Sequence, residues 1–363
     1  MGIRFDRDTR RATNGPMIFF SDSSSEQAFS EEIKGAVNSN LSFYSYRHPG
    51  DMMISFGSSE GFVEGVGLPG FVIGFFDSDK PYITIPYKGC NRNSCEGLSY
   101  SYPEKSTTFE EYKTELKAIH ESLLSTNGGK IVAARVIKMD YSLDLGATFY
   151  SLSRAYPDAY IFCFGTPATG CWIGASPELM LKADNNTLNT MSLAGTRQAQ
   201  QSGLWDEKNL EEQALVTSFI RDVFRNNSLT PEIGDTFTKN AGAIEHICTP
   251  VYSTIPPFGF NTAKLLKALS PTPAVSGFPR EKAIEIIKKY ESFNRGCYGG
   301  FCGPFHFDGD FCFNVILRCA SVTEKNFNVY AGGGITLKSD LKEEWNETEI
   351  KASVFLNSAV RKQ

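Results

Sequence analysis

Hydrophobic residues recur along this chain with two different spacings. In the first hundred residues, short apolar runs are separated by Gly, Ser, Asp and Pro, a pattern typical of strands joined by tight turns. It predicts strands at 17–20, 52–56, 71–76 and 82–87. From residue 107 the spacing changes to three and four, which predicts an amphipathic helix over 107–126 with an apolar face made of Phe109, Tyr112, Leu116, Ile119 and Leu123.

The remainder of the chain mixes both spacings. Further strands are predicted at 130–137, 159–164, 170–175, 188–194, 311–321 and 327–332. Further helices are predicted at 206–225, 280–292 and 341–358. Because strands and helices do not alternate strictly, the order favours an α+β fold over a doubly wound parallel sheet.

Composition narrows the classes of function. The chain has 363 residues, 41% of them hydrophobic, which is enough for a large core in one or two domains. A net charge of −5 argues against a nucleic-acid surface, and the most apolar run, 68–76, is too short to span a membrane. Nine cysteines without a C-x-x-C pair predict reduced thiols rather than a zinc site, and a cytoplasmic protein.

Carboxylates interrupt the apolar stripes of two predicted helices. Glu212 shares a helical face with the apolar residues three, four and seven positions further on, and a buried carboxylate needs a cation as partner. On the last helix, Glu344, Glu347 and Lys351 project from one side. Carboxylates from two helices that face one pocket would suit Mg²⁺. The alternative is a solvated helix face with an ordinary Glu347–Lys351 pair.

Other candidate residues lie where predicted strands begin or end. Glu178 follows a Ser-Pro turn that exposes its carboxylate, and Gly195 permits close approach of the backbone at a strand end. Lys130 begins a strand, either as a partly desolvated amine suited to act as a base or as a surface residue that caps the preceding helix. Arg318 interrupts an apolar strand, so if buried it requires an anion.

A run of glycines supplies the last candidate. In Tyr330-Ala-Gly-Gly-Gly334-Ile the glycines predict a turn with exposed backbone N–H groups, which is a plausible nest for a carboxylate. The run lacks the Lys-Ser/Thr of a phosphate loop, so it does not indicate a nucleotide site.

Taken together, these motifs resemble the chorismate-utilising enzyme family. The resemblance covers about residues 109–357 and rests on seven strings in order: Lys130-Ile-Val-Ala-Ala-Arg, GASPEL (174–179), LAGTR (193–197), PTPAVSGFPR (271–280), the Arg318 strand, YAGGGI (330–335) and EEWNETEIK (343–351). It implies one large α+β fold of two stacked, largely antiparallel sheets flanked by helices. Residues 1–108 would form an N-terminal sheet portion and 109–363 the chorismate-binding catalytic portion of this single structural domain.

The resemblance also implies a role for each candidate residue. Lys130 is similar to the family's water-activating base and Glu178 to its general acid. Mg²⁺ would be bound directly by Glu212 and Glu347, with Glu344 in support through water. The groups that would line the pocket and hold the substrate are Gly195, Thr196, His246, Ala274, Tyr298, Arg318, Gly332, Gly334 and Lys351.

Two positions choose among the activities of the family. Members that install nitrogen or form a covalent link carry Gln in place of Lys130, or Lys at the position of Ala194. With Lys130 and Ala194 present, water is the expected nucleophile, and the implied activity is that of an isochorismate synthase of the menaquinone or siderophore type. No glutaminase subunit would then be needed. The sequence shows no obvious apolar interface stripe, which favours a monomer.

Rival readings stay open at this point. A salicylate synthase would share the base but usually carries Thr at the position of Ala274, and a catalytically silent chorismate-binding protein would need neither acid nor base. The chain also departs from the family pattern twice. Ser270 replaces the usual His before PTPA, and Asn209-Leu-Glu-Glu212-Gln213 replaces the usual acid-x-x-Glu-His.

Overall fold

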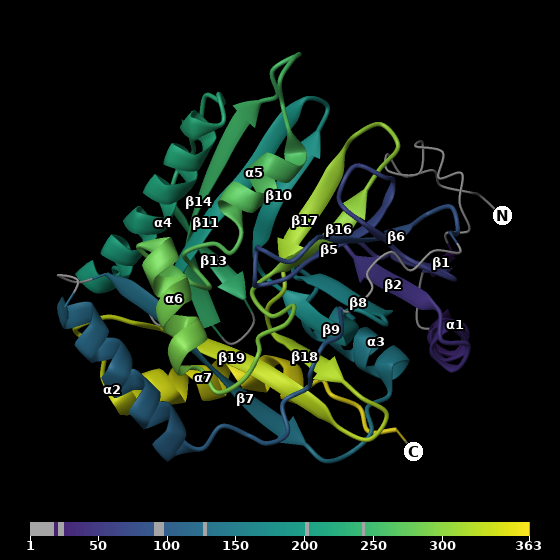
Figure 1. Cartoon of the computed structure of the whole chain (residues 1–363), viewed down its shortest axis with the longest axis horizontal. Helices are drawn as coiled ribbons and strands as arrows, with labels where there is room; N and C mark the ends of the chain where they lie inside the picture. The colour runs from purple at the N-terminus through teal and green to yellow at the C-terminus, as the bar shows by residue number, and fades with distance from the viewer. Residues whose placement is uncertain are drawn as a thin grey trace.

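Two antiparallel sheets and seven helices make up the described part of the chain in this computed structural model, which covers residues 18–20, 25–90, 98–125, 129–199, 203–241 and 244–362. The predicted α+β class is therefore confirmed. In Figure 1 the two sheets pack against each other, with helices on their outer faces.

One sheet has nine strands. Their order across the sheet is β1 (Ile18–Phe20), β3 (Ile54–Ser59), β2 (Ser42–Arg47), β8 (Tyr160–Thr166), β9 (Gly170–Ser176), β18 (Cys319–Val322), β19 (Phe327–Ile335), β7 (Lys130–Met139) and β15 (Gly277–Phe278). Helices α1 (Glu26–Asn38), α3 (Leu145–Ala155), α2 (Phe109–Ser125) and α7 (Leu341–Leu356) pack against its outer face.

The other sheet has ten strands. Their order is β12 (Glu232–Ile233), β14 (Ile244–Thr254), β11 (Thr187–Gln198), β10 (Leu179–Asp184), β17 (Phe311–Val315), β16 (Phe301–Phe305), β5 (Gly70–Gly74), β6 (Ile83–Pro86) and β4 (Val63–Glu64), and β13 (Phe237–Ala241) also pairs with β14. Helix α4 (Glu207–Asn226) covers β11 and β14, and α5 (Thr262–Leu269) lies beside it. Helix α6 (Arg280–Tyr290) packs on β7 and β15.

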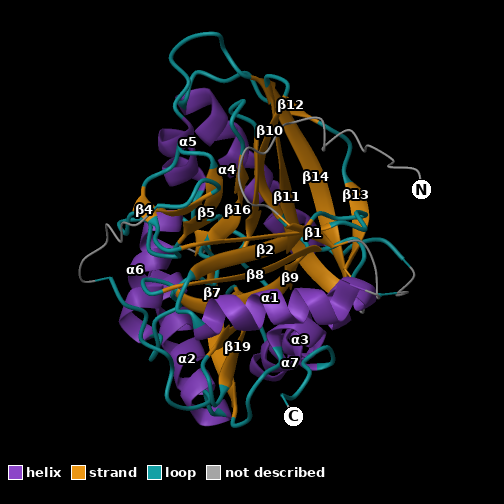
Figure 2. Cartoon of the chain, turned by 90° about the vertical axis from the view of Figure 1, so that its right-hand side faces the viewer, coloured by secondary structure: helices purple, strands orange, loops and turns teal. Residues whose placement is uncertain are grey.

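Aromatic side chains fill the space between the sheets. Tyr44 of the nine-stranded sheet stacks on Phe71 of the ten-stranded sheet, with ring centroids 5.1 Å apart. Phe162, Trp172 and Phe301 belong to the same buried cluster. Strands β2, β8 and β9 run across the view of Figure 2, whereas β10, β11, β14 and β16 run up it, so the sheets cross at a large angle.

The N-terminal segment contributes to both sheets. Strands β1, β2 and β3 pair within the nine-stranded sheet, while β4, β5 and β6 pair within the ten-stranded one. The apolar runs of this segment do form strands, but helix α1 was not predicted, although its buried Phe29, Ile33 and Ala36 have helical spacing. The boundary proposed after residue 108 stays a prediction.

The prediction of a single strand over 311–321 is wrong, because this segment forms two strands. Ile316 and Leu317 are not part of either strand, and Arg318 has a left-handed φ of +47°. β17 belongs to the ten-stranded sheet and β18 to the nine-stranded sheet. The chain therefore crosses from one sheet to the other at Arg318.

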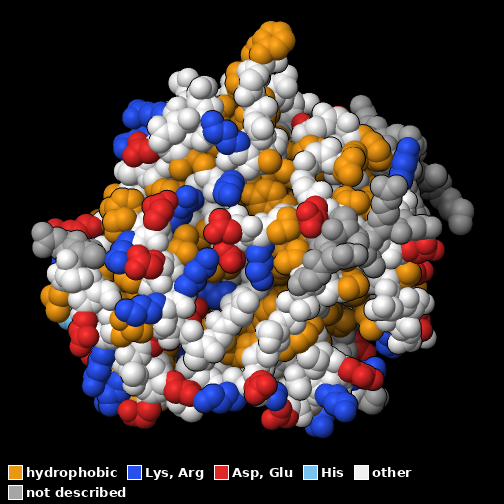
Figure 3. Space-filling model, in the orientation of Figure 1, with side chains coloured by type: hydrophobic (Ala, Val, Ile, Leu, Met, Phe, Trp, Pro, Cys, Tyr) orange, Lys and Arg blue, Asp and Glu red, His pale blue; other side chains and the backbone are white. Residues whose placement is uncertain are grey.

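The surface agrees with the modest net charge. On the face shown in Figure 3, basic and acidic side chains are interspersed rather than separated into a single-sign stripe. No helix among the described residues is long and apolar enough to cross a membrane. The eight cysteines within the described ranges are free thiols, five of them buried.

Candidate active site

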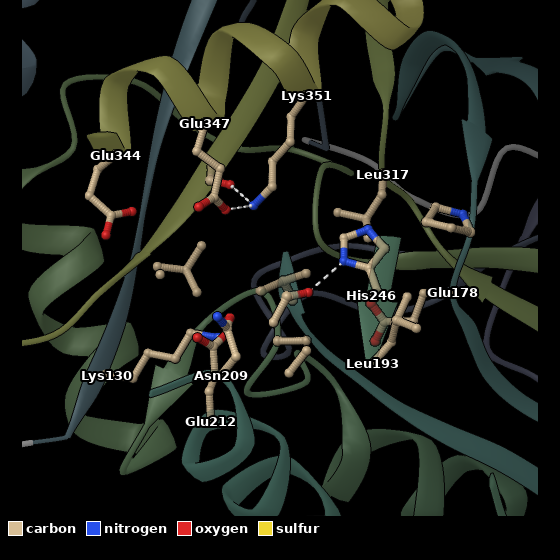
Figure 4. A pocket seen from close by; sticks show the side chains of 18 of the residues that line it. Lys130, Glu178, Leu193, Asn209, Glu212, His246, Leu317, Glu344, Glu347 and Lys351 are labelled. Carbon is tan, nitrogen blue, oxygen red and sulfur yellow. Dashed lines mark hydrogen bonds and ion pairs between the residues drawn. The ribbon is translucent and has the colours of Figure 1, made fainter. Parts of the chain in front are cut away.

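A cavity of about 290 Å³ opens between the two sheets and helices α4 and α7. Almost every residue that the sequence singled out lines it, although these residues come from distant parts of the chain (Figure 4). They are Lys130, Glu178, Gly195, Glu212, His246, Ala274, Tyr298, Arg318, Gly332, Gly334, Glu344, Glu347 and Lys351. The side chain of Thr196 lies outside the described part.

Glu178 and Arg318 lie at two neighbouring crossovers between the sheets. Pro177 and Glu178 connect β9 of one sheet to β10 of the other, just as Arg318 connects β17 to β18. Backbone hydrogen bonds tie the crossovers together, from Ala175 N to Arg318 O (3.2 Å) and from Val315 N to Glu178 O (3.0 Å). Both side chains are thereby presented to the cavity at the seam between the sheets.

Burial sets the protonation of Glu178. Its side chain is almost inaccessible to solvent, and desolvation raises its pKa to about 7. The Thr272 hydroxyl, which donates to Glu178 Oε1 at 3.4 Å, and the positive charges of Lys130, Lys239 and Arg318 act in the opposite direction. A carboxyl group with this pKa is suited to donate a proton near neutral pH.

His246 is a neutral ring with a defined tautomer. Burial, reinforced by the charge of Arg318, lowers its pKa to about 3. Its Nδ1 lies 2.7 Å from Gly195 O, and a carbonyl oxygen can only accept, so Nδ1 carries the proton. Nε2 is then an acceptor for Arg318 Nη2 at 3.4 Å. The predicted close approach at Gly195 is present, with φ +67° at a bulge in β11.

Arg318 is buried without a carboxylate partner. The residue is 8% exposed, and within the described residues no carboxylate lies at salt-bridge distance from its guanidinium. A buried guanidinium in this condition is costly unless an anion binds to it. An anion bound in the cavity would therefore supply the partner that the sequence predicted for Arg318.

Lys130 is buried at the start of β7, so the surface reading is wrong. Its residue is 5% exposed, and its ammonium forms an ion pair with Glu212 of α4. Gln213, the neighbour of Glu212, holds that helix against the sheet by donating to Ser192 O (3.1 Å) and Thr249 Oγ1 (2.9 Å). Gln213, at the position of the usual His, thus serves to hold α4 on the sheet.

Helix α7 presents a row of charges to the cavity. Asp340 caps the helix by accepting from the backbone N–H groups of Lys342 and Glu343. Glu344 is buried, and Lys351 Nζ lies 2.5 Å from Glu347 Oε1 and donates to Gly332 O at 2.9 Å. The ordinary Glu347–Lys351 pair exists, but it faces the cavity rather than open solvent.

The glycine run 330–335 is not a turn, which corrects the prediction. It lies within β19 and pairs with β7 along its whole length, while β18 pairs with β19 only as far as Val329. The glycines instead make room for neighbouring side chains. A Cβ on Gly334 would lie 2.4 Å from Lys130 Cε, and one on Gly332 would lie 2.9 Å from the Tyr298 hydroxyl.

Comparison with known proteins agrees with the motifs. Residues 90–359 match the family model described as chorismate binding enzyme. Isochorismate synthase EntC of Escherichia coli K12 is 31% identical over 273 residues, which are 70% of this chain and 67% of that protein. This chain belongs to the chorismate binding enzyme family.

Other relatives carry related names. Isochorismate synthase MenF of E. coli K12 is 28% identical over 69% of this chain and 60% of its own length. Anthranilate synthase component 1 of Neisseria meningitidis is 26% identical over 74% of this chain and 58% of its length. The chain thus spans about three fifths of these two relatives and two thirds of EntC.

Solved structures of the family have the same fold. The structure of E. coli MenF covers 96% of this chain and 95% of its own with a TM-score of 0.76 at 18% identity. A putative isochorismate synthase, DhbC from Bacillus anthracis, gives a TM-score of 0.66 at 22% identity and covers 94% of this chain and 90% of its own. The predicted architecture of two stacked sheets is therefore the fold of this family.

The donor set of the cavity fits a hard cation. Among the described lining residues, six carry carboxylates and three carry cationic groups. No group of three or more His, Cys, Asp or Glu side chains in the described ranges is arranged around a common metal position. Mg²⁺ nevertheless needs only one or two protein carboxylates when water and substrate oxygens complete its shell. Glu212 and Glu347, from different helices, both line the cavity and supply that number of carboxylates.

Several lining residues were not singled out by the sequence. Asn209 lies against Gly195, where a Cβ would meet its Oδ1 at 3.0 Å, and Val275 adjoins the predicted Ala274. Leu193 and Leu317 supply apolar walls. Val275, Leu193 and Leu317 are marked only by adjacency to a predicted residue, whereas Asn209 stands where the family pattern has an acidic residue. Ser270 is buried at the end of α5, and nothing in the structure explains its replacement of His.

Proposed function

We propose that this enzyme is an Mg²⁺-dependent isochorismate synthase, which converts chorismate reversibly to isochorismate. The observation that carries the proposal is the separation of Lys130 and Glu178 at opposite ends of one cavity (Figure 4). An exchange of hydroxyl groups on two ring carbons needs a base at one position and an acid at the other.

The reaction follows from these two groups. The Lys130 amine accepts a proton from water as the water oxygen bonds to ring carbon 2. The double bonds shift, the bond from carbon 4 to its hydroxyl breaks, and Glu178 donates the proton with which that group leaves as water. Each group would contribute about 10²–10⁴ in rate. Ala194 lines the cavity where an amine would allow a covalent adduct, so water remains the nucleophile.

The substrate dianion would meet the cavity's donors. Arg318, which has no carboxylate at salt-bridge distance within the described residues, would bind a carboxylate of the substrate. Tyr298 stays a neutral donor because burial raises its pKa to about 12. Lys351 and the open edge of β19 at Gly332 and Gly334 offer further hydrogen bonds. The same pocket would be shaped by His246, Gly195 and Ala274. A role for Thr196 rests on the family resemblance alone.

Mg²⁺ would be held by Glu212 and Glu347, with Glu344 in support through water. When bound, the ion orients a substrate carboxylate and stabilises charge as it redistributes. Glu212 would have to leave its ion pair with Lys130 to act as a ligand, and the Lys130 amine would then be available as the base. The excess of carboxylates in the cavity supports this assignment, because a dianion would otherwise meet a net negative wall.

The relatives support this member of the family over others. Isochorismate synthases are among the most similar proteins, including one from Pseudomonas aeruginosa named for salicylate biosynthesis, 30% identical over 62% of this chain and 50% of its length. We further propose that the protein is a cytoplasmic monomer that needs no glutaminase subunit, since neither covalent nor nitrogen chemistry is expected with Ala194 and Lys130.

The test is incubation of the purified protein with chorismate and Mg²⁺, with and without a chelator, followed by NMR of the products. Isochorismate in equilibrium with chorismate, lost on chelation and regained with added Mg²⁺, is the expected result. Salicylate and pyruvate would instead establish a salicylate synthase. Binding of chorismate without any product would identify a silent binding protein and overturn the proposal.

A further inference from the structure

A lysine outside the cavity holds the turn that carries Glu178. Lys239 lies on β13, which pairs along the edge of β14, opposite His246 in register. Its Nζ donates to Pro177 O at 2.9 Å, immediately before Glu178 in the chain. This hydrogen bond links the edge of the ten-stranded sheet to the crossover on which Glu178 sits.

The ammonium of Lys239 has no carboxylate partner within the described residues. Its recorded acceptors are Pro177 O and, at 3.6 Å, Met191 Sδ, and its side chain is partly buried. A lysine kept only for solubility would extend into water or pair with an acidic neighbour. Here the stem is folded inward and the charge is placed beneath the turn.

The charge of Lys239 acts on the Glu178 carboxyl. The groups that act on its carboxyl are Thr272, Lys130, Lys239 and Arg318, and Cys248 on β14 lies within reach of both Lys239 and Glu178. Lys130 and Arg318 line the cavity, but Lys239 does not. Because Lys239 lies outside the cavity lining, its ammonium is bound to Pro177 O rather than directed at the space where a substrate anion would bind.

We propose that Lys239 is a positioning residue that fixes the Pro177–Glu178 crossover and supplies a constant positive charge behind the Glu178 carboxyl. This inference deepens the proposed function and rests on it only for the role of Glu178 as acid. Without Lys239, burial would act on Glu178 with less opposition, and the carboxyl would hold its proton to a higher pH.

The experiment measures the titration of Glu178 directly in the metal-free protein. Side-chain ¹³C NMR of glutamate-labelled protein follows the carboxyl, whose resonance is assigned by its loss in Glu178→Gln. Lys239→Met keeps the stem but removes the charge and the donor, whereas Lys239→Arg keeps both. Lys182→Met is the matched control, because Lys182 lies on β10, just beyond Glu178, and pairs with Asp184 at the surface.

Lys239→Met is expected to raise the titration midpoint of Glu178 by about one pH unit, whereas Lys239→Arg and Lys182→Met change it by less than about 0.3. The limb of the pH–rate profile that Glu178 governs should move upward by the same amount. An unchanged midpoint in Lys239→Met, with or without a lower melting temperature, would overturn the inference. Because the titration is read without turnover, absence of activity on chorismate would count against the proposed function alone.

Discussion

Within the described ranges, charged side chains are paired on one side of the cavity and buried without an opposite charge as partner on the other. On the side of helices α4 and α7, the carboxylates of Glu212 and Glu347 are each paired with a lysine. At the seam between the sheets, Arg318 has no carboxylate partner among the described residues, and Glu178 is buried with a raised pKa. Both arrangements lie within one cavity.

This difference separates two tasks. Paired charges on the helix side can exchange partners at modest cost when a cation and a dianion enter, because each released group finds a new partner. The groups at the seam are held in position by backbone crossovers and packing, and burial keeps a proton on Glu178 near neutral pH until it is donated. We infer that the helix side binds, while the seam provides the acid and an anchor for the substrate.

The largest effect is expected from Lys130→Ala. This change removes the amine that pairs with Glu212 on the helix side and that is the proposed base of the reaction. The turnover rate should fall by about 10²–10⁴ because water loses its base. Chorismate binding, measured by calorimetry, should persist because Arg318 and Lys351 remain. The control is Lys138→Ala on the same strand, whose ammonium contacts Glu104 O outside the cavity. Full activity in Lys130→Ala would remove this residue from the role of base.

Glu178→Gln tests the seam through stability. A folded pKa of about 7 against an ordinary 4.5 means that the wild-type protein loses stability as pH rises from 4.5 to 7, because ionisation is easier in the unfolded chain. The variant lacks this loss, so its stability relative to wild type should increase by about 3 kcal/mol between those limits. Urea unfolding across this pH range measures the difference, with the exposed Glu285→Gln as control. A pH-independent difference would contradict the raised pKa.

Glu347→Gln tests the helix side. Loss of this carboxylate should raise the Mg²⁺ concentration needed for half-maximal activity by about tenfold or more, as expected for a direct ligand. Titration of activity with Mg²⁺, and of metal binding by calorimetry, gives the shift, again with Glu285→Gln for comparison. Superimposable Mg²⁺ curves would refute the ligand assignment.

The smallest expected effect comes from Gly334→Ala. The added methyl group would displace the Lys130 stem, which is flexible, so the turnover rate should fall by about threefold to tenfold with little change in melting temperature. Kinetics and thermal unfolding of the same preparation measure the effect on turnover and the effect on stability separately. A large loss of stability with an unchanged rate would show that Gly334 serves the sheet rather than the position of Lys130.

Local patterns were sufficient for several elements. The spacing of Phe109 to Leu123 predicted α2, and its start is fixed by Thr108 and Glu111, which cap each other through backbone N–H groups. Strand β7 begins at Lys130 as predicted. The break at Arg318 and the extended glycine run were not predicted, because pairing with distant strands outweighs local propensity. Helix α1 was also missed, although the spacing of its buried residues is a local signal.

The sequence by itself determined the family, the α+β class and the identity of the candidate residues, since each motif is a local string of residues. Only the tertiary structure decided which of them share a cavity and in what electrical state. The pKa of Glu178, the tautomer of His246 and the absence of a carboxylate partner for Arg318 within the described residues depend on burial between two sheets. Burial and charge pairing arise from segments far apart in the chain, so no local pattern contains them.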